Sequence, residues 1–256
     1  MNTRLVLLVD VGNSACKWAW LTAAGLQHHA ALAYEDERFS YQYLLEQWQT
    51  AGEITDILVA AVANNDVVFQ VLHELSSQTH RQIKRLSSSE HAAGVKNAYQ
   101  HADKLGVDRW LAMIAAKNQL QSAVCVVDCG TAMTIDIIAA DGQHLGGQII
   151  PGMQMMANAL HNSTALLPQV TSYEDAGCLG KDTDSCISQG IRTALSGAVN
   201  SVMSENQHIG PLQGIITGGN GSKIMSMLKG NWQYRPHLVL EGMAVLAKMN
   251  NKGDVE

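Results

Sequence analysis

An apolar run that stops on an aspartate and a glycine occurs twice in this chain. Each copy has the same order of strand-like run, Asp-x-Gly turn and second strand-like run: residues 5–9, 10–12 and 17–21, then 123–127, 128–130 and 134–138. One isolated copy is adequately explained as a strand that ends in a tight turn. Two copies favour a duplicated α/β fold, in which two related halves place both turns at one phosphate-binding cleft.

Length and composition fit such a fold. The chain has 256 residues, enough for one large domain or two medium ones, and it is 46% hydrophobic and 16% charged, as in ordinary globular proteins. The formal net charge of -6 argues against a protein that grips nucleic acid. No apolar run approaches the roughly 20 residues of a membrane helix, and no signal peptide is apparent, so we expect a cytoplasmic protein without a membrane partner.

The cysteines support the same compartment. They are odd in number and form no C-x-x-C pair: Cys16, Cys125, Cys129, Cys178 and Cys186. We expect free thiols in a reducing environment rather than a zinc site or a disulfide framework.

Further elements follow from apolar periodicity. We expect additional strands at residues 29–33, 57–63 and 214–217, and helices at residues 67–75, 108–120, 189–203, 222–228 and 238–249. Asn65 or Asp66 can cap the first of these helices, and Asp141-Gly142 is suited to a hairpin turn. We predict an N-terminal half over residues 1–115 and a C-terminal half over residues 116–256, with a possible return of the last helix.

The first Asp-Gly turn has the chemistry of a phosphate site. Gly12 allows close approach of the backbone, and Asn13 and Ser14 add short donors to an anion-binding turn. Lys17 is close enough in sequence to supply a positive charge. Asp10 is suited to Mg²⁺, which prefers few carboxylates together with phosphate oxygens.

Two other glycine-rich stretches extend this interpretation. Thr131 follows the second turn, and the loop that starts at Gly218 and Gly219 offers another close approach to a nucleotide. A P-loop is excluded, because Asn220 and Gly221 stand where Lys and Ser/Thr are required. A Rossmann site is excluded too, because no G-x-G-x-x-G opens a helix after the first strand.

A third element, "YQHADKLGVDRW", places a carboxylate and a guanidinium side by side at the start of a helix. Gly106 bends the chain before Asp108 and Arg109. Asp108 can accept a proton from an alcohol, and Arg109 with Tyr99 can hold a substrate carboxylate. Alone, Asp108 would be explained as an acidic residue that complements the helix dipole.

Together these stretches resemble the type III pantothenate kinase family. The matching segments run in family order over nearly the whole chain: "DVGNSACKW", "KNAYQHADKLGVDRW", "DCGTAMTID", "GGQIIPGM", "TALLP", "GKDT" and "ITGGNG". The resemblance implies two ribonuclease-H-like halves, as in acetate and sugar kinases, heat-shock chaperones and actin. It also implies phosphorylation of pantothenate by ATP, the first step of coenzyme A synthesis, with Mg²⁺ and with K⁺ or NH₄⁺.

The resemblance assigns roles residue by residue. The ATP-binding residues would be Asp10, Val11, Gly12, Asn13, Ser14, Ala15, Cys16, Lys17, Thr131, Gly218 and Gly219. The pantothenate-binding residues would be Tyr99, Gly106, Val107, Asp108, Arg109 and Thr183, with Asp108 as the catalytic base. Asp10 would lie near Mg²⁺ and Asp128 would bind the monovalent cation. The family's usual homodimer would place part of the pantothenate pocket at the subunit interface.

Two departures and two rival functions remain. Ser14 replaces the commoner threonine, and Ala102 stands where many members carry proline, which bears on the stiffness of that loop. One rival is a regulatory accessory factor of the same fold with weak or no kinase activity. The other is an exopolyphosphatase or sugar kinase of the same superfamily, which has no reason to carry the block from Tyr99 to Arg109.

Overall fold

The computed structural model describes residues 5–49, 53–173 and 179–249. It divides the chain into two compact units, one of Met1–Asn118 with His237–Glu256 and one of Gln119–Pro236. Each unit has its own five-stranded sheet.

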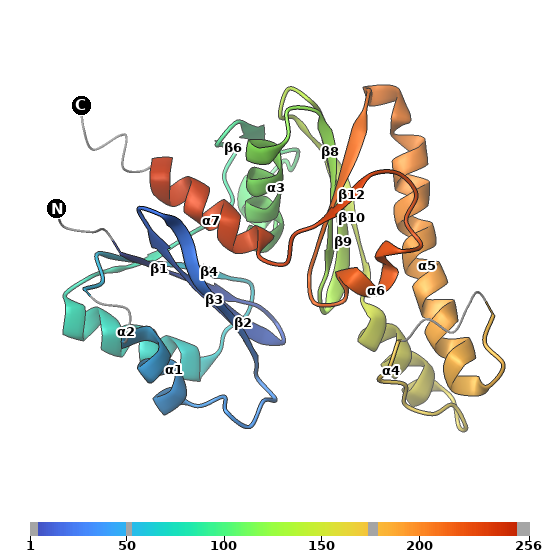
Figure 1. The fold of residues 1–256 in the computed structure, drawn as a ribbon, viewed down its shortest axis with the longest axis horizontal. Helices are drawn as coiled ribbons and strands as arrows, with labels where there is room; N and C mark the ends of the chain where they lie inside the picture. The colour runs from blue at the N-terminus through green and yellow to red at the C-terminus, as the bar shows by residue number, and fades with distance from the viewer. Residues whose placement is uncertain (1–4, 50–52, 174–178, 250–256) are drawn as a thin grey trace. The chain divides into compact units, whose positions relative to one another are not determined.

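The first unit begins with three strands and ends with the C-terminal helix (Figure 1). Its elements are β1 (Val6–Val11), β2 (Ala15–Thr22), β3 (Gly25–Ala33), α1 (Tyr41–Gln49), β4 (Asp56–Ala61), α2 (Asp66–Thr79), β5 (Ile83–Arg85), β6 (His91–Ala92), β7 (Val95–Lys96), the 3₁₀ helix η1 (Ala102–Lys104), α3 (Val107–Gln119) and α7 (Leu238–Met249). The sheet order is β3-β2-β1-β4-β5. Strand β1 pairs antiparallel with β2 and parallel with β4.

The second unit repeats this arrangement. Its elements are β8 (Ala123–Cys129), β9 (Ala132–Ile138), β10 (His144–Pro151), α4 (Met153–Ser163), α5 (Thr183–Glu205), the 3₁₀ helix η2 (Gln207–Ile209), β11 (Leu212–Thr217), α6 (Gly221–Met225) and β12 (Trp232–Tyr234). The sheet order is β10-β9-β8-β11-β12, with β8 antiparallel to β9 and parallel to β11. Because order and direction match strand for strand, the predicted duplicated α/β fold is confirmed.

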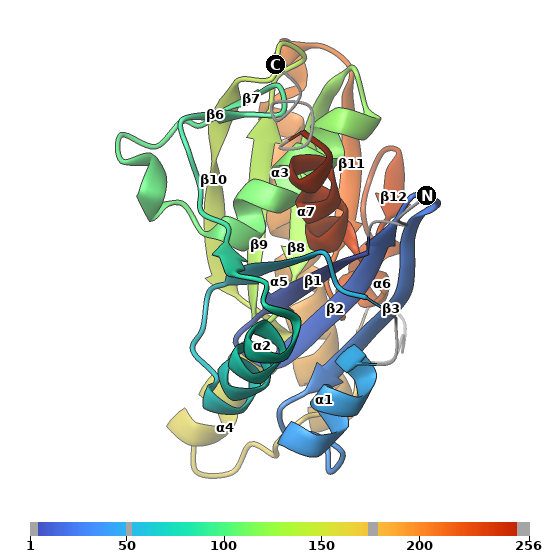
Figure 2. The ribbon, with the colours of Figure 1, turned by 90° about the vertical axis from the view of Figure 1, so that its left-hand side faces the viewer.

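Helices α1 and α2 cover one face of the first sheet (Figure 2), and their apolar side chains form a core with it. Alternate residues of β1, among them Leu7 and Val9, point into this core, where Trp48 of α1 and Leu72 of α2 pack. Trp18 of β2 meets Trp48 edge-on, with ring centroids 6.0 Å apart. The cap of α2 is Asn65, as expected, since its side chain accepts a bond from Val68 N at 3.1 Å.

Helix α7 packs on β1, β2 and β4 of the first sheet. Close packing also joins it to α3, because a Cβ on Gly242 would overlap the carbonyl of Leu111. The last helix therefore returns to the first unit. The functional division between residues 1–115 and 116–256 stays a prediction.

In the second unit, α5 supplies the core. Ile191, Leu195 and Val199 recur at helical spacing and pack with residues of β8 and β9 such as Val127 and Ile135. This helix begins at Thr183, six residues earlier than the apolar pattern predicted, because Asp182 caps its start. Helix α6 is shorter than predicted and stops at Met225, after which the chain forms turns.

Both aspartates of the repeated turns lie inside their strands rather than after them. Asp10 pairs in register with Lys17, and Asp128 pairs with Thr134. The strand pairing therefore continues through each aspartate, which lies at the C-terminal end of its strand.

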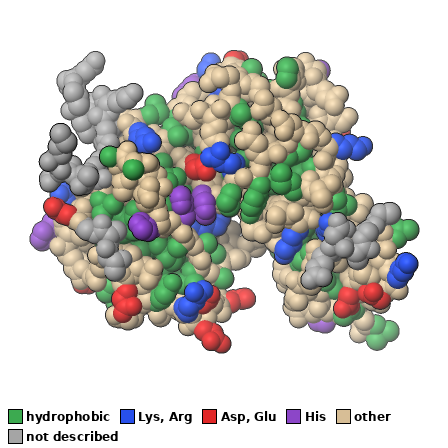
Figure 3. Space-filling model, viewed as in Figure 1, with side chains coloured by type: hydrophobic (Ala, Val, Ile, Leu, Met, Phe, Trp, Pro, Cys, Tyr) green, Lys and Arg blue, Asp and Glu red, His purple; other side chains and the backbone are tan. Residues whose placement is uncertain are grey.

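Two observations bear on nucleic-acid and membrane partners, one from the face drawn in Figure 3 and one from the helices of the described residues. On the face drawn in Figure 3, the Lys and Arg side chains of the described residues are scattered singly among acidic ones, without a broad basic patch. In the ranges that the structure describes, no helix is both long and apolar enough to cross a bilayer.

Candidate active site

The first turn joins β1 to β2, and a tyrosine holds it through hydrogen bonds. Gly12 N donates to Ala15 O at 3.0 Å, which closes the turn. Tyr34 donates its hydroxyl to Gly12 O at 2.9 Å, and its backbone N donates to Ser14 O at 3.0 Å. Asn13 and Ser14 are exposed above this support. The turn is thus a fixed loop with polar groups toward solvent, which suits an anion.

Tyr34 was not among the site residues predicted from the sequence. Burial raises the pKa of its phenol, with smaller contributions from Cys16 and Asp10. The hydroxyl therefore stays protonated and keeps donating to the turn. No local pattern marks this residue, since its partner lies 22 residues away.

A carboxylate and an ammonium group face the same side of the first sheet. Asp10 Oδ2 lies 3.9 Å from Lys17 Nζ, and the side chains are 6% and 29% exposed. At this separation the pair is loose, so the lysine can also contact a bound phosphate. Val11 and Cys16 lie opposite each other and are buried in the core, whereas Ala15 is half-buried.

The second turn, Asp128 to Thr131, packs against the start of α4. Gly152 N donates to Thr131 O at 3.1 Å, and a Cβ on Gly152 would overlap the carbonyls of Gly130 and Thr131. Thr131 itself is exposed, and Cys129 is buried, which raises the pKa of its thiol. Gly152 was not among the predicted residues, although the Pro-Gly pair in "GGQIIPGM" marks it.

The Gly218 loop lies directly against this second turn. Thr217 pairs with Asp128 across β11 and β8, and Asn220 N donates to Cys129 O at 3.1 Å. Gly218 has φ +84°, and a Cβ there would lie 2.5 Å from Asp128 Oδ1. Only glycine fits here, which explains the sequence at this position. The turn and the loop, predicted separately, therefore lie side by side in the second unit.

In the first unit, the predicted substrate residues are gathered at the start of α3. Arg109 Nη1 donates to the Tyr99 hydroxyl at 2.9 Å, and its guanidinium lies 5.7 Å from the centre of that ring. Arg109 is only 5% exposed, whereas Tyr99 is 36% exposed and Asp108 is half-buried. Asp108 Oδ1 accepts from Arg109 N at 2.8 Å. A Cβ on Gly106 would lie 2.6 Å from the same oxygen.

The loop before α3 is fastened by residues that the sequence did not single out. Asn97 Nδ2 donates to Ser89 O and Ala102 O at 3.2 and 3.3 Å, and its Oδ1 accepts from Tyr99 N at 3.0 Å. Ser88 donates to Leu105 O at 2.8 Å. Ala102 opens η1, so the loop is held by these bonds even without a proline at that position.

Thr183 lies elsewhere, as the first residue of α5 in the second unit. Asp182 caps the helix by accepting from Ser185 N at 2.8 Å, and bonds from Ser185 keep the pKa of Asp182 below its usual value. Thr183 is exposed beside this cap. Val107, the remaining predicted substrate residue, is buried at the first position of α3.

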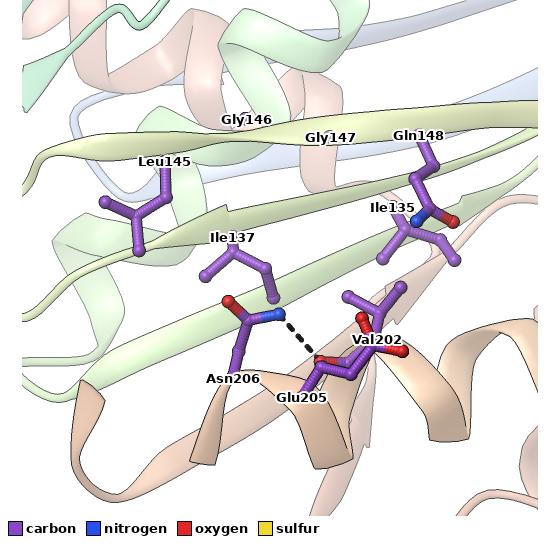
Figure 4. Close-up of a pocket in the computed structure, with 9 residues that line it drawn as sticks. All are labelled: Ile135, Ile137, Leu145, Gly146, Gly147, Gln148, Val202, Glu205 and Asn206. Carbon is purple, nitrogen blue, oxygen red and sulfur yellow. Dashed lines mark hydrogen bonds between the residues drawn. The ribbon is translucent and has the colours of Figure 1, made fainter. Parts of the chain in front are cut away.

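The second unit also carries a groove of about 310 Å³ that contains none of the predicted site residues (Figure 4). Its lining comes from β9, β10 and the end of α5: Ile135, Ile137, Leu145, Gly146, Gly147, Gln148, Val202, Glu205 and Asn206. A Cβ on Gly146 would meet no atom within 4 Å, so this glycine leaves open space beside the strand. The Asn206 side chain donates to Val202 O at 2.8 Å on one wall.

Two sheets with the same strand order, each with an Asp-x-Gly turn, define a duplicated α/β fold. Solved structures with this fold align over nearly the whole chain. A Sinorhizobium meliloti protein assigned by its name to the 2-dehydro-3-deoxygalactonokinases has a TM-score of 0.63 at 11% identity and covers 96% of this chain and 99% of its own. A Campylobacter jejuni protein named for the Baf family of transcriptional activators has a TM-score of 0.60 at 22% identity, with the same coverage. At these identities the likeness shows the fold alone.

Sequence comparison defines the family within this class. The model of the type III pantothenate kinase family matches residues 6–205. A type III pantothenate kinase from Nitrosococcus oceani is 35% identical over 97% of this chain and 96% of its own length. The chain belongs to the type III pantothenate kinase family.

Proposed function

We propose that the chain carries out its family's reaction, the phosphorylation of pantothenate by ATP at the start of coenzyme A synthesis, by direct in-line transfer. The pantothenate hydroxyl oxygen bonds to the γ-phosphorus while the bond from that phosphorus to the β,γ-bridging oxygen breaks. ADP leaves and the hydroxyl proton passes to a carboxylate of the protein. The observation that carries this mechanism is the grouping of Asp108, Arg109 and Tyr99 at the start of α3.

Asp108 is the proposed proton acceptor. It is half-buried, and Arg109 N holds its Oδ1 at 2.8 Å, so the carboxylate has a defined direction without being sealed from substrate. A positioned carboxylate of this kind contributes roughly 10²–10⁴-fold to a proton-transfer step.

Arg109 and Tyr99 are the proposed contacts for the pantothenate carboxylate. The guanidinium is buried and bonded to the tyrosine hydroxyl, so its orientation is fixed before substrate arrives. An arginine fork matches a carboxylate in geometry and charge. Gly106 and Val107 form the adjoining backbone, and Thr183 is proposed as a further pantothenate contact.

ATP is the proposed ligand of the Asp-Gly turns. In the first unit it would contact the stretch from Asp10 to Lys17, where the Tyr34 bonds keep the turn in place. In the second unit it would contact Thr131, Gly218 and Gly219. Fixed backbone donors and a lysine are suited to spread phosphate charge, and such positioning supplies most of the rate in phosphoryl transfer.

The residues present fit the two cations that the family implies. Within the described ranges no group of three or more His, Cys, Asp and Glu side chains could hold a metal. Mg²⁺ needs few carboxylates, and Asp10 would supply one while phosphate oxygens and water complete the shell. The half-buried carboxylate of Asp128, whose Oδ1 lies against the backbone of Gly218, is the group that would ligate K⁺ or NH₄⁺. When bound, these ions neutralise phosphate charge.

A homodimer in the cytoplasm completes the proposal. Its support is the resemblance together with exposed apolar residues on β10, an edge strand of the second sheet: Leu145 is 46% exposed and Ile149 is 63% exposed. Exposed edge strands of this kind are sites of pairing with another chain. Light scattering of the wild-type protein and of Ile149→Glu would test this, with a monomeric wild type contradicting it.

The test of the function is ADP release by purified protein with ATP and Mg²⁺, with and without pantothenate, in potassium and then in sodium buffer. Turnover that requires pantothenate and is faster in potassium is the expected result. Silence under every condition, from protein shown to be folded, would favour a regulatory factor of the same fold instead.

A further inference from the structure

A buried arginine of α5 holds the short helix that follows the Gly218 loop. Arg192 is 2% exposed, and its Nε donates to the carbonyl of Lys223 at 3.0 Å. Its Nη1 donates to Gln189 Oε1 at 3.1 Å, one turn earlier on the same helix. A buried cation is costly unless it is bonded, so these contacts fix the guanidinium in one place.

Helix α6 needs such support. It has only five residues, and helices this short are not stable alone in water. Its last carbonyls also lack partners within the helix, and a cation at this end complements them. Further along the same face of α5, Asn200 accepts from Lys229 N at 2.8 Å and donates to Met227 O at 3.0 Å.

A series of hydrogen bonds continues from Arg192 to the second phosphate turn. Lys223 N and Nζ donate to the backbone and side-chain oxygens of Asn220, at 3.1 and 2.9 Å. Asn220 N in turn donates to Cys129 O at 3.1 Å, next to Gly130. Hydrogen bonds thus connect the centre of α5 to the end of β8, in the order Arg192, Lys223, Asn220, Cys129.

We infer that Arg192 is a positioning residue for nucleotide binding, which fixes the Gly218 loop against the Asp128 turn through Lys223 and Asn220. The inference rests on the proposed function, in which this loop contacts ATP. Arg192 does not touch the substrates itself. Lysine cannot replace it fully, because a single ammonium lacks the planar fork that bonds Lys223 O and Gln189 together.

The test compares Arg192→Met and Arg192→Lys with Val199→Ala, a change to a fully buried residue of the same helix that lies outside this series of bonds. Arg192→Met is expected to raise the KM for ATP about 10- to 100-fold and to leave the KM for pantothenate within about two-fold. Arg192→Lys should fall between it and the wild type. Hydrogen exchange at residues 218–225 should be faster in the Arg192 variants but not in Val199→Ala.

An unchanged KM for ATP in a folded Arg192 variant would overturn the inference. If Arg192→Met does not fold, the KM for ATP of Arg192→Lys and of Lys223→Met decides whether the inference holds. The side chain of Lys223 is only half-buried, so its replacement should not unfold the protein. Titration with a fluorescent ATP analogue distinguishes a failure of the proposed function from a failure of the inference about Arg192. A wild type that binds the analogue without pantothenate turnover contradicts the proposed substrate, whereas equal affinities of wild type and variants contradict the role of Arg192.

Discussion

Asp10 and Asp128 occupy equivalent places in the two sheets. Each is the penultimate residue of its unit's first strand, in β1 and in β8. Asp10 lies opposite Lys17 on the antiparallel neighbour, and Asp128 lies opposite Thr134. The duplication therefore preserves the carboxylate but changes the residue opposite it from a lysine to a threonine. This difference fits the proposed roles, with the lysine beside phosphate in one unit and a monovalent cation supplying positive charge in the other.

Replacing Asp108 by asparagine should abolish turnover without unfolding the protein. The amide keeps an oxygen for Arg109 N but cannot accept the hydroxyl proton, so kcat should fall by about 10²-fold or more. The measurement is steady-state kinetics together with a thermal melt. Asp103→Asn is the matched control, since that carboxylate is 71% exposed on η1 and should leave kcat unchanged. Near wild-type activity in Asp108→Asn would contradict the proposed base.

Lys17→Met should weaken ATP binding specifically. Its ammonium is the cation nearest to Asp10 in the first turn, and its loss removes one phosphate contact, worth about 10-fold or more in affinity. Isothermal titration with a non-hydrolysable ATP analogue measures this. Lys84→Met, which breaks an exposed pair with Asp56, serves as the control. Equal affinities in the two variants would show that Lys17 does not face the phosphates.

Gly218→Ala should cost both stability and activation by potassium. The backbone there has φ +84°, and a Cβ would meet Asp128 Oδ1 and the Cys129 backbone. Left-handed strain alone costs about 1–3 kcal/mol. Denaturant unfolding should show at least this loss, and the rate ratio between potassium and sodium buffers should fall toward one. Gly219→Ala meets nothing within 4 Å and should unfold like the wild type. Comparable stability in both variants would contradict the described geometry.

A stacked histidine pair should make the protein less stable in acid. The rings of His29 and His237 are 4.3 Å apart and inclined by 16°. Burial lowers the pKa of His237, and His29 and Lys17 lower it further, while Glu241 opposes this. Because the folded state binds the proton less readily than the unfolded state, stability is present above the ordinary histidine pKa and is lost as pH falls below it.

The variant that tests this pair is His29→Phe, which keeps a stacked ring but removes one source of positive charge. Its loss of unfolding free energy between about pH 7.5 and about pH 5.5 should be smaller than that of the wild type. Urea unfolding at both pH values gives the comparison. An identical loss in both proteins would show that the pair does not contribute.

Local pattern was enough to predict the repeated architecture and several boundaries. The last helix spans Leu238–Met249, the range that the apolar spacing predicted, and Asn65 caps α2 as its position implied. The start of α5 was missed because its first turn is polar and hides the apolar period. The bound on β1 was wrong because a charged residue, Asp10, continues the ladder, which sequence patterns treat as a strand end.

The supports of the candidate site could not be predicted in the same way. Tyr34 and Arg192 act through hydrogen bonds to backbone atoms 22 and 31 residues away, and Asn97 bonds the backbone of Ser89, eight residues before it. Such partners depend on the completed fold, and no short motif encodes them. The motif residues themselves were recognisable because their chemistry is local: a glycine where a Cβ does not fit, and an aspartate beside an arginine.

The most direct test of the central claim is transfer of label from ATP carrying ³²P at the γ position, followed in a single turnover with excess enzyme and pantothenate. The account predicts that the wild-type protein transfers the label to pantothenate without a labelled protein intermediate. With Asp108→Asn the label should stay on ATP. Label that accumulates on the protein, or that reaches pantothenate equally fast with Asp108→Asn, would contradict direct transfer assisted by Asp108.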